Sequence, residues 1–203
     1  MNHGEFSGTP NANWLTEDEI GDRAMELLDD FWFVEPDGQQ WDAPKGSVVD
    51  GASIPRALWS LVGPPYTGDY RRASVVHDVA CVAARNNSEK RLAADRMFYH
   101  ACRAGGCSIY QSILLYVGVR IGAVVPNVKE WRTADSAVKD GARLHQTEDE
   151  ERLVRDYQRI SEHVLARGES DDPKELERRM NKALEVVVGL KLPKVGKGRK
   201  HRR

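Results

Sequence analysis

The sequence predicts an α+β protein, with a small N-terminal antiparallel sheet followed by a helical bundle and a C-terminal helical hairpin. Two observations predict this class. Short apolar segments separated by turn residues extend to about Asp50, which is typical of strands. Beyond that residue, longer runs bounded by caps and glycines are typical of helices. The 203 residues suffice for one core and a small helical appendage.

The region before Asp50 is expected to hold one helix and two or three strands. Thr16 and Glu19 form a capping box, which predicts a helix to about Leu28 within a polar N-terminal arm. Residues 31–34 and the segment around 39–49 are separated and interrupted by Pro- and Gly-containing turns. These signals predict a short hairpin or meander.

Four helices are expected in the core, each bounded by clear breaks. Residues 63–65 end the first, 86–87 separate the second from the third, and 105–106 end the third. Because the connection at 86–87 is so short, the helices that it joins are expected to run antiparallel and in contact. The four predicted ranges are 55–62, 70–84, 88–104 and 108–124.

A charged helical appendage is expected after Pro126. Capping signals at Thr147 and Asp172 open two helices, each with apolar residues along one side. These residues are Leu153, Tyr157, Ile160 and Val164 in the first helix, and Leu176, Met180, Ala183, Leu184 and Val187 in the second. Packing on the body is the favoured interpretation, and a docking or self-association surface is the alternative.

The chain is therefore divided into an N-terminal arm and helix (1–29), a core domain (30–126), a charged helical appendage (127–190) and a basic tail (191–203). The tail holds seven Lys or Arg and no acid, with two glycines and a proline, so it is expected to be disordered. A solubilising end is favoured for it. Contact with nucleic acid or another polyanion is the alternative.

Composition excludes several classes of protein. The 30 Lys and Arg nearly balance the 31 Asp and Glu, which excludes a uniformly basic nucleic-acid-binding protein and a self-repelling acidic chain. Cys81, Cys102 and Cys107 lie in apolar segments, which favours reduced thiols over a disulfide framework. The most apolar stretch, 109–125, contains Arg120, so neither a membrane span nor an export signal is expected.

Three acids and one histidine interrupt otherwise apolar segments. His77 and Asp78 lie inside one predicted helix, Asp95 lies on the next, and Asp50 follows two valines. An ionised carboxylate left alone in a core is strongly unfavourable. Asp95 is therefore expected to accept a hydrogen bond from His77, which would leave the other ring nitrogen to act as a base or metal ligand.

Two chemical mechanisms fit these residues. In the first, His77 takes a proton from water while Asp78 and Asp50 hold a divalent cation such as Ca²⁺ or Mg²⁺. In the second, these four side chains are mostly direct ligands of Mg²⁺, Mn²⁺ or Zn²⁺. A single histidine makes zinc the weaker choice. Asp78 has the alternative of capping a neighbouring backbone segment.

The same residues also fit a purely structural arrangement. A buried His–Asp pair between helices fixes their register, and Asp50 can close a strand as an Asx turn. Cys81, one turn after His77, lies on an apolar face, which favours packing over reactivity. Ser53 is interpreted as a helix cap and His100 as a surface residue.

These landmarks resemble the family catalogued as domain of unknown function 1353, small proteins of phages and prophages. The similar residues, within about 30–125, are Pro44-Lys45-Gly46, Asp50 to Arg56, Trp59, Gly63-Pro64-Pro65, His77-Asp78, Asp95 with Phe98, and Val119-Arg120 with Gly122. The resemblance implies a phage origin and no settled activity. Where such proteins often have an aromatic residue shortly after the His–Asp pair, this chain has Val79 and Cys81.

A weaker resemblance is to phospholipases A2, whose central helix carries a His–Asp pair with a further Asp on an antiparallel helix. It implies that His77 is the base, Asp78 a calcium ligand and Asp95 the acid that orients the imidazole. The glycine-rich calcium loop and the disulfides of the secreted enzymes are absent from this sequence.

The expected function is that of a phage-encoded, hydrolase-like protein acting on an ester or phosphoester, with His77 and Asp95 as catalytic residues. The alternative is a non-enzymatic phage accessory protein, in virion assembly or interference with a host factor, that binds its partner or a second copy through the C-terminal hairpin. Either would act in the host cytoplasm or with the virion. The enzyme requires His77 to reach solvent in a cleft, whereas the accessory protein allows it to be buried.

Overall fold

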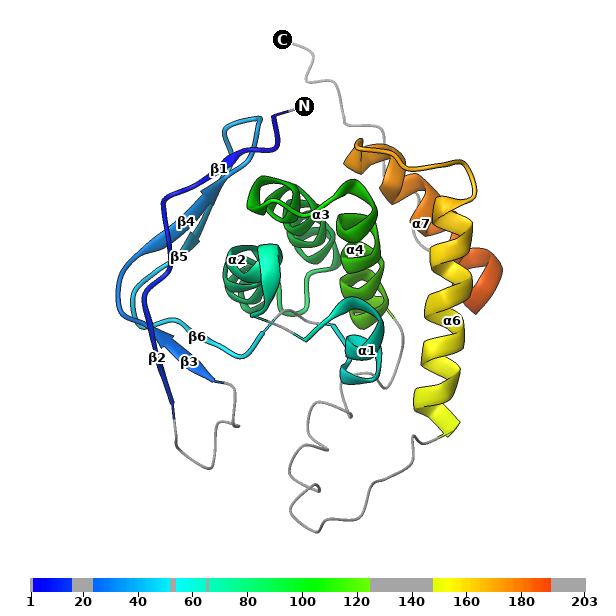
Figure 1. Cartoon of the computed structure of the whole chain (residues 1–203), viewed down its shortest axis with the longest axis horizontal. Coiled ribbons are helices and arrows are strands. Elements are labelled where there is room, and N and C mark those ends of the chain that lie inside the picture. Colours follow the sequence, from blue (N-terminus) through cyan, green and yellow to red (C-terminus); the bar gives the residue numbers. More distant parts are fainter. Residues whose placement is uncertain (1, 16–23, 52–53, 65, 125–147, 191–203) are drawn as a thin grey trace.

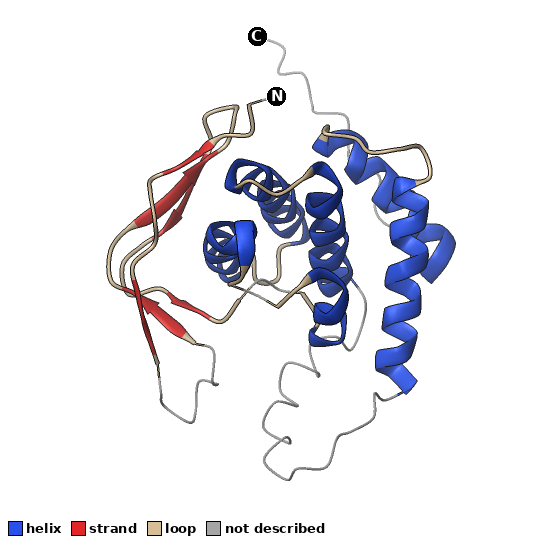
Figure 2. Cartoon of the chain, viewed as in Figure 1, coloured by secondary structure: helices blue, strands red, loops and turns tan. Residues whose placement is uncertain are grey.

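The computed structural model describes residues 2–15, 24–51, 54–64, 66–124 and 148–190. A layer of strands lies against one side of a central group of helices, and two further helices cover the opposite side (Figure 1). Strands and helices occupy separate layers (Figure 2). The α+β class predicted from the sequence is confirmed.

The strands of the described residues form two antiparallel sheets of three strands each. The first sheet has the order β1-β4-β5, with β1 at Glu5–Phe6, β4 at Phe31–Val34 and β5 at Gln40–Ala43. The second has the order β2-β3-β6, with β2 at Ala12–Trp14, β3 at Met25–Leu27 and β6 at Val48–Val49. The prediction of a hairpin or meander is confirmed as a hairpin of β4 and β5, whereas β6 pairs with β3 in the second sheet.

The helix predicted to extend to about Leu28 is wrong at its C-terminal end. Met25–Leu27 form β3, which pairs with β2 on one side and β6 on the other. Leu27 is 1% exposed, so its side chain contributes to the core from the strand. At Met25–Leu27 tertiary pairing therefore prevails over the predicted continuation of the helix. Residues 16–23 of that predicted helix lie outside the described residues.

The helices of the core lie where the sequence predicts them, to within about two residues. A 3₁₀ turn, η1, precedes the short helix α1, and a second, η2, precedes α2. Their bounds are Arg56–Leu58 for η1, Trp59–Val62 for α1, Gly68–Tyr70 for η2, Arg71–Ala83 for α2, Ser88–Gly105 for α3 and Ile109–Val124 for α4. The side chain of Asn87 accepts a hydrogen bond from the Lys90 N–H and so caps α3.

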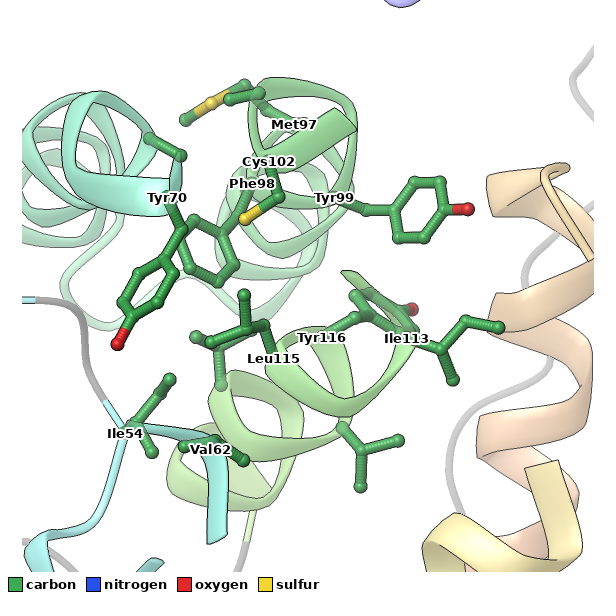
Figure 3. Close-up of a cluster of buried hydrophobic side chains, with 14 of the residues drawn as sticks. Ile54, Val62, Tyr70, Met97, Phe98, Tyr99, Cys102, Ile113, Leu115 and Tyr116 are labelled. Carbon is green, nitrogen blue, oxygen red and sulfur yellow. The ribbon is translucent and has the colours of Figure 1, made fainter. Parts of the chain in front are cut away.

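Part of the buried core lies between α3 and α4. Figure 3 shows Phe98 and Cys102 of α3 facing Leu115 of α4, and all three are fully buried. Tyr99 points away from this cluster, toward the C-terminal helices, and its hydroxyl reaches the segment before α7. Close packing on both sides of α3 fixes the position of this helix relative to its neighbours.

The C-terminal hairpin consists of α6 at Glu148–Leu165 and α7 at Pro173–Val188. It packs on α4, α3 and η1. Its predicted apolar stripes are buried apart from Val187, which is half-buried, and Tyr157 donates a hydrogen bond to the Leu114 carbonyl on α4. The favoured interpretation, packing on the body, is therefore confirmed. The residues predicted to form the basic tail lie outside the described part.

Among the described residues, no helix is both long and apolar enough to cross a membrane.

Candidate functional site

The predicted contact between His77 and Asp95 is confirmed. His77 lies on α2 and Asp95 on α3, and these two helices make extensive contact. Nε2 of His77 lies 2.9 Å from Oδ1 of Asp95. Both side chains are 0% exposed, so the hydrogen bond is made entirely inside the protein.

Two arginines also bind Asp95. Nε of Arg91, one turn earlier on α3, donates to Oδ1 at 3.0 Å, and Nη1 of Arg120 on α4 donates to Oδ2 at 3.1 Å. Asp95 therefore links three helices through charged donors on both of its oxygens. The sequence analysis did not assign these arginines to the site. Two sequence features could have predicted these contacts. Arg91 lies four residues before Asp95, and Arg120 is the lone charged residue in an apolar predicted helix.

Asp78 binds backbone, as the second of its two predicted roles required. Its Oδ2 accepts hydrogen bonds from the N–H of Gly51 at 2.6 Å, the N–H of Asp50 at 3.0 Å and the hydroxyl of Tyr66 at 3.3 Å. The Asp78 side chain thus anchors the segment that follows β6 onto α2. Asp50 contacts the Asp78 carboxylate through its backbone N–H, and Asp50 itself is an exposed residue.

Tyr66 adopts a left-handed backbone conformation, with φ of 62°, that non-glycine residues seldom occupy. Burial raises the pKa of its hydroxyl, and the nearby Asp78 carboxylate raises it further. Tyr66 therefore stays protonated and acts as a donor to Asp78. The strain of this conformation is tolerated because the Tyr66 hydroxyl is bound to Asp78 and its carbonyl accepts a hydrogen bond from Nε of Arg71.

Cys81 packs against the imidazole of His77. Its Sγ lies 3.4 Å from Nε2 and 3.7 Å from Nδ1 of His77, and the residue is partly exposed. The i, i+4 spacing places the thiol directly over the imidazole. His100, which was interpreted as a surface residue, is half-buried, with its ring against that of His3.

Charges in the cluster reinforce one another. Burial alone would lower the pKa of His77, but Cys81 and Asp95 raise it to about 9. Burial would raise the pKa of Asp95, yet the hydrogen bond from His77 and the charge of Arg91 hold it below its usual range. At neutral pH the cluster therefore contains an ionised carboxylate, an imidazolium and two guanidinium groups.

One atom each of His77, Cys81 and Asp95 lies within 4.8 Å of the others, which is close enough to share a metal ion. The surrounding charge opposes that use. Both oxygens of Asp95 already accept hydrogen bonds from guanidinium groups, and these positive charges repel a cation. The arrangement thus favours an internal ion network over a metal centre.

Two hollows on the described surface lie away from this cluster. One of about 350 Å³ lies beside β1 and the turn after β4, lined by residues such as Gly4 and Glu35. Another of about 150 Å³ lies between the second sheet and α2, lined by residues such as Leu27, Tyr66 and Val75. Neither is lined by His77, Cys81 or Asp95.

A second carboxylate cluster lies at the opposite end of α3, around Asp171 in the segment before α7. His3 Nε2 lies 2.9 Å from one oxygen of Asp171, while Tyr99 and Arg103 each donate to the other at 2.8 Å. Nδ1 of His100 lies 3.3 Å from Nδ1 of His3. This cluster ties the N-terminal segment to α3 and to the C-terminal hairpin.

Comparison with known proteins gives a family match within the core region. Residues 25–119 match the family described as "Protein of unknown function (DUF1353)". The match contains β3 to β6, α2, α3 and most of α4, and with them His77, Asp78 and Asp95. The C-terminal hairpin lies outside it.

Two curated proteins of Sinorhizobium fredii (strain NBRC 101917 / NGR234) are similar to this chain. The uncharacterized protein y4jT is 38% identical over 118 residues, which are 57% of this chain and 33% of that protein. The uncharacterized protein y4iH is 35% identical over 115 residues, which are 54% of this chain and 47% of that protein. This chain therefore spans less than half of either relative. No solved structure matches it significantly.

Proposed function

We propose that this chain is a non-enzymatic accessory protein of a phage or prophage, in which the His77–Asp95 cluster holds the helices in register. One observation carries the proposal. Asp95 accepts charged hydrogen bonds from α2, α3 and α4, and neither it nor His77 exposes any surface. A general base must touch water or substrate, whereas a structural ion network is most effective when it is sealed.

Energetics support a structural role. Removing one partner from a buried ion pair typically destabilises a protein by about 3–5 kcal/mol, because the other charge is left uncompensated. Such a network disfavours alternative packings in which its members do not meet. Asp78 acts in the same way on the segment after β6, because it collects two backbone N–H groups and one hydroxyl.

The accessory role itself is binding, in virion assembly or in interference with a host factor, in the host cytoplasm or on the virion. The apolar stripes of α6 and α7 are used inside the protein, so the partner contact is placed on the polar outer face of the hairpin. Exposed arginines such as Arg152 and Arg178, whose side chains are 73% and 72% exposed, support this placement. The phage origin is tested by whether neighbouring genes encode virion or lysis proteins.

A second candidate function is the hydrolase predicted from the sequence. It is favoured by one observation, the hydrogen bond from Nε2 of His77 to Asp95, which leaves Nδ1 on the other side of an oriented ring. Phospholipases A2 resemble this arrangement. The candidate needs a conformational opening that brings His77 to solvent, and a divalent cation such as Ca²⁺ or Mg²⁺ would then have to displace the donors on Asp78.

Thermal unfolding with and without Ca²⁺, Mg²⁺, Mn²⁺ and Zn²⁺ separates the two candidates. The variants are His77→Gln and Asp78→Asn, with His163→Gln on the exposed surface of α6 as the matched control. The accessory protein predicts that no cation raises Tm and that the two cluster variants lower it while the control does not. A cation that raises Tm in the wild type but not in a folded Asp78→Asn variant would contradict it, as would ester turnover that disappears in folded His77→Gln.

A further inference from the structure

Two of the three cysteines lie at the ends of the turn that joins α3 to α4. The backbone N–H of Cys107 donates a hydrogen bond to the carbonyl of Cys102 at 3.1 Å. Inside that bond, the N–H of Gly106 donates to the carbonyl of Arg103, and Gly106 has the left-handed conformation with φ of 113°. This pattern is a Schellman motif, which commonly brings the side chains of its first and last residues into contact. In this turn both of those residues are cysteines.

The two thiols are hydrogen-bonded to each other, and this contact separates their acidities. The hydrogen bond from Cys102 holds the pKa of the Cys107 thiol below its ordinary value. Burial, followed by the hydrogen bond with Cys107, raises the pKa of the Cys102 thiol. Cys107 is therefore the sulfur that ionises first, and the thiolate is the form of cysteine that attacks a disulfide.

The backbone around both sulfurs is held from two sides. A Cβ atom on Gly105 would overlap the backbone oxygen of Asp69, so η2 packs directly on the turn. Nη1 of Arg103 donates to the carbonyl of Cys107 and closes the turn a second time. A disulfide needs Cα atoms roughly 4.4–6.8 Å apart. The direct backbone hydrogen bond keeps the two cysteines within that reach, so little movement is needed to join their sulfurs.

Neither of these sulfurs is open to solvent. Cys102 is 0% exposed and Cys107 is 1% exposed, and both belong to the buried core. Cys81, by contrast, is partly exposed on α2, and all three are free thiols in this structure. The two buried thiols are therefore placed to react with each other, and the third serves as a comparison within the same chain.

We propose that Cys102 and Cys107 are a redox pair that closes into a disulfide by exchange with a low-molecular-weight disulfide. The Cys107 thiolate attacks one sulfur of the reagent, so a mixed disulfide forms and the other sulfur leaves as a thiolate. Cys102 then loses its proton and attacks the Cys107 sulfur, so the internal S–S bond forms as the mixed one breaks. The protein sulfurs lose two electrons to the reagent, and the two protons that they release end on the two thiols that leave.

The state of the pair depends on its surroundings. A reducing cytosol keeps such cysteines as thiols, as the composition of the chain also favours, whereas an oxidising medium closes the bond. The disulfide would tie the end of α3 to the start of α4, because the two residues border the turn between these helices. The oxidised chain is therefore expected to have a higher Tm than the reduced chain. This inference does not depend on the proposed function.

The first test measures the equilibrium of the pair in the wild-type chain, folded and in urea. The chain is held in mixtures of reduced and oxidised glutathione until the disulfide fraction is constant, because shielded sulfurs exchange slowly. Free thiols are then blocked and the chain is digested with trypsin. Cleavage after Arg103 separates the two cysteines, so the disulfide leaves peptides 97–103 and 104–120 linked.

The equilibrium constant for closing the disulfide is expected to be about tenfold larger or more in the folded chain than in urea. The reason is that the fold already holds the two sulfurs together, so less freedom is lost when they are joined. An equal or smaller constant in the folded chain, as expected of cysteines that only pack, overturns the proposal. So does a disulfide that links peptide 73–85, which contains Cys81, in place of this pair.

Variants then tie the bond to the two residues. Oxidation should raise Tm by several degrees in the wild type and in Cys81→Ala, the matched control, and should leave Tm unchanged in Cys107→Ala. Should Cys107→Ala fail to fold, the wild type and the control still decide. A Tm that oxidation leaves unchanged or lowers in Cys81→Ala overturns the proposal, because this variant contains no other pair of thiols.

Discussion

The two carboxylate clusters of α3 have similar chemistry and different surroundings. Asp95 binds one histidine and two arginines, and Asp171 binds one histidine, one arginine and one tyrosine. The side chain of Asp95 is 0% exposed, whereas that of Asp171 is 20% exposed. Water can therefore replace lost partners at Asp171 but not at Asp95.

That difference decides what each cluster does. A sealed network leaves an uncompensated charge whenever one member is removed, so it enforces a single packing of α2, α3 and α4. A partly solvated cluster gains less from each contact, because water screens its charges and competes for its donors. The Asp171 cluster thus docks the N-terminal segment and the hairpin onto a core that the Asp95 cluster defines.

The largest expected effect is that of removing Asp95. Asp95→Ala leaves Arg120 and His77 buried without their carboxylate, and should lower the free energy of unfolding by about 3–5 kcal/mol. Asp171→Ala should lower it by about 1–2 kcal/mol, because its partners can turn to water. Urea denaturation of both variants measures the difference. Equal losses would remove the distinction between the clusters.

Raising the pH should weaken the Asp95 cluster next. The pKa of His77 is raised to about 9 in the folded protein, against about 6.5 in an unfolded chain. Because the pKa of His77 is higher in the folded than in the unfolded protein, its protonation stabilises the folded state fully below about pH 6.5. This stabilisation is lost as the pH rises through about 9. The free energy of unfolding should therefore fall by up to about 3 kcal/mol over that interval. In His77→Gln the fall should be absent, and a flat wild-type profile would refute the charge assigned to the imidazole.

Acid should weaken the Asp171 cluster. Hydrogen bonds from Arg103, Tyr99 and His3 outweigh burial and lower the pKa of Asp171 to about 2. Because the pKa of Asp171 is lower in the folded than in the unfolded protein, its ionised form stabilises the folded state above the unfolded pKa of about 3.9. That contribution is lost as the pH falls toward 2. Screening at this partly exposed site limits the loss to less than about 2 kcal/mol. Comparing Asp171→Asn with wild type between pH 5 and 2 checks this, since the variant should lose less stability.

The smallest effect is expected on the exposed face of α6. Arg155 and Glu151 form an i, i+4 pair at 3.5 Å with side chains 61% and 55% exposed. Arg155→Ala should change the free energy of unfolding by less than about 0.5 kcal/mol, because such pairs are screened by water and salt. A larger loss would show that surface pairs, and not burial, account for the ranking of the clusters.

Local signals in the sequence were sufficient for most helices and for the central contact. Capping residues and glycines lie at the helix ends that they mark, so these ends could be predicted locally. Helical spacing predicts which faces of α2 and α3 pack together, so the hydrogen bond between His77 and Asp95 could also be predicted. The strand at Met25–Leu27 could not, because its partners β2 and β6 lie 11 or more residues away. Pairing with strands this far away in the sequence leaves no signal in the residues around Met25–Leu27, so a prediction from local patterns missed it.

The chemistry of the site was harder to predict than its geometry. Whether His77 reaches solvent depends on how α3, the strands and the segment after β6 cover α2, and no pattern within one helix encodes that. Arg120 lies 25 residues from Asp95, so its role required the packing of α4 on α3. Cys81 was interpreted from its apolar helix face, and in the structure its sulfur also contacts the imidazole one turn earlier.

Hydrogen–deuterium exchange at the C2 position of histidine tests the sealed cluster most directly, because its rate reports both the solvent access and the pKa of each imidazole. His163, exposed on α6, serves as the internal reference. The account predicts that His77 exchanges far more slowly than His163, with a midpoint near pH 9. Exchange at His77 as fast as at His163 would contradict it, since the imidazole would then be open to water as an enzyme requires.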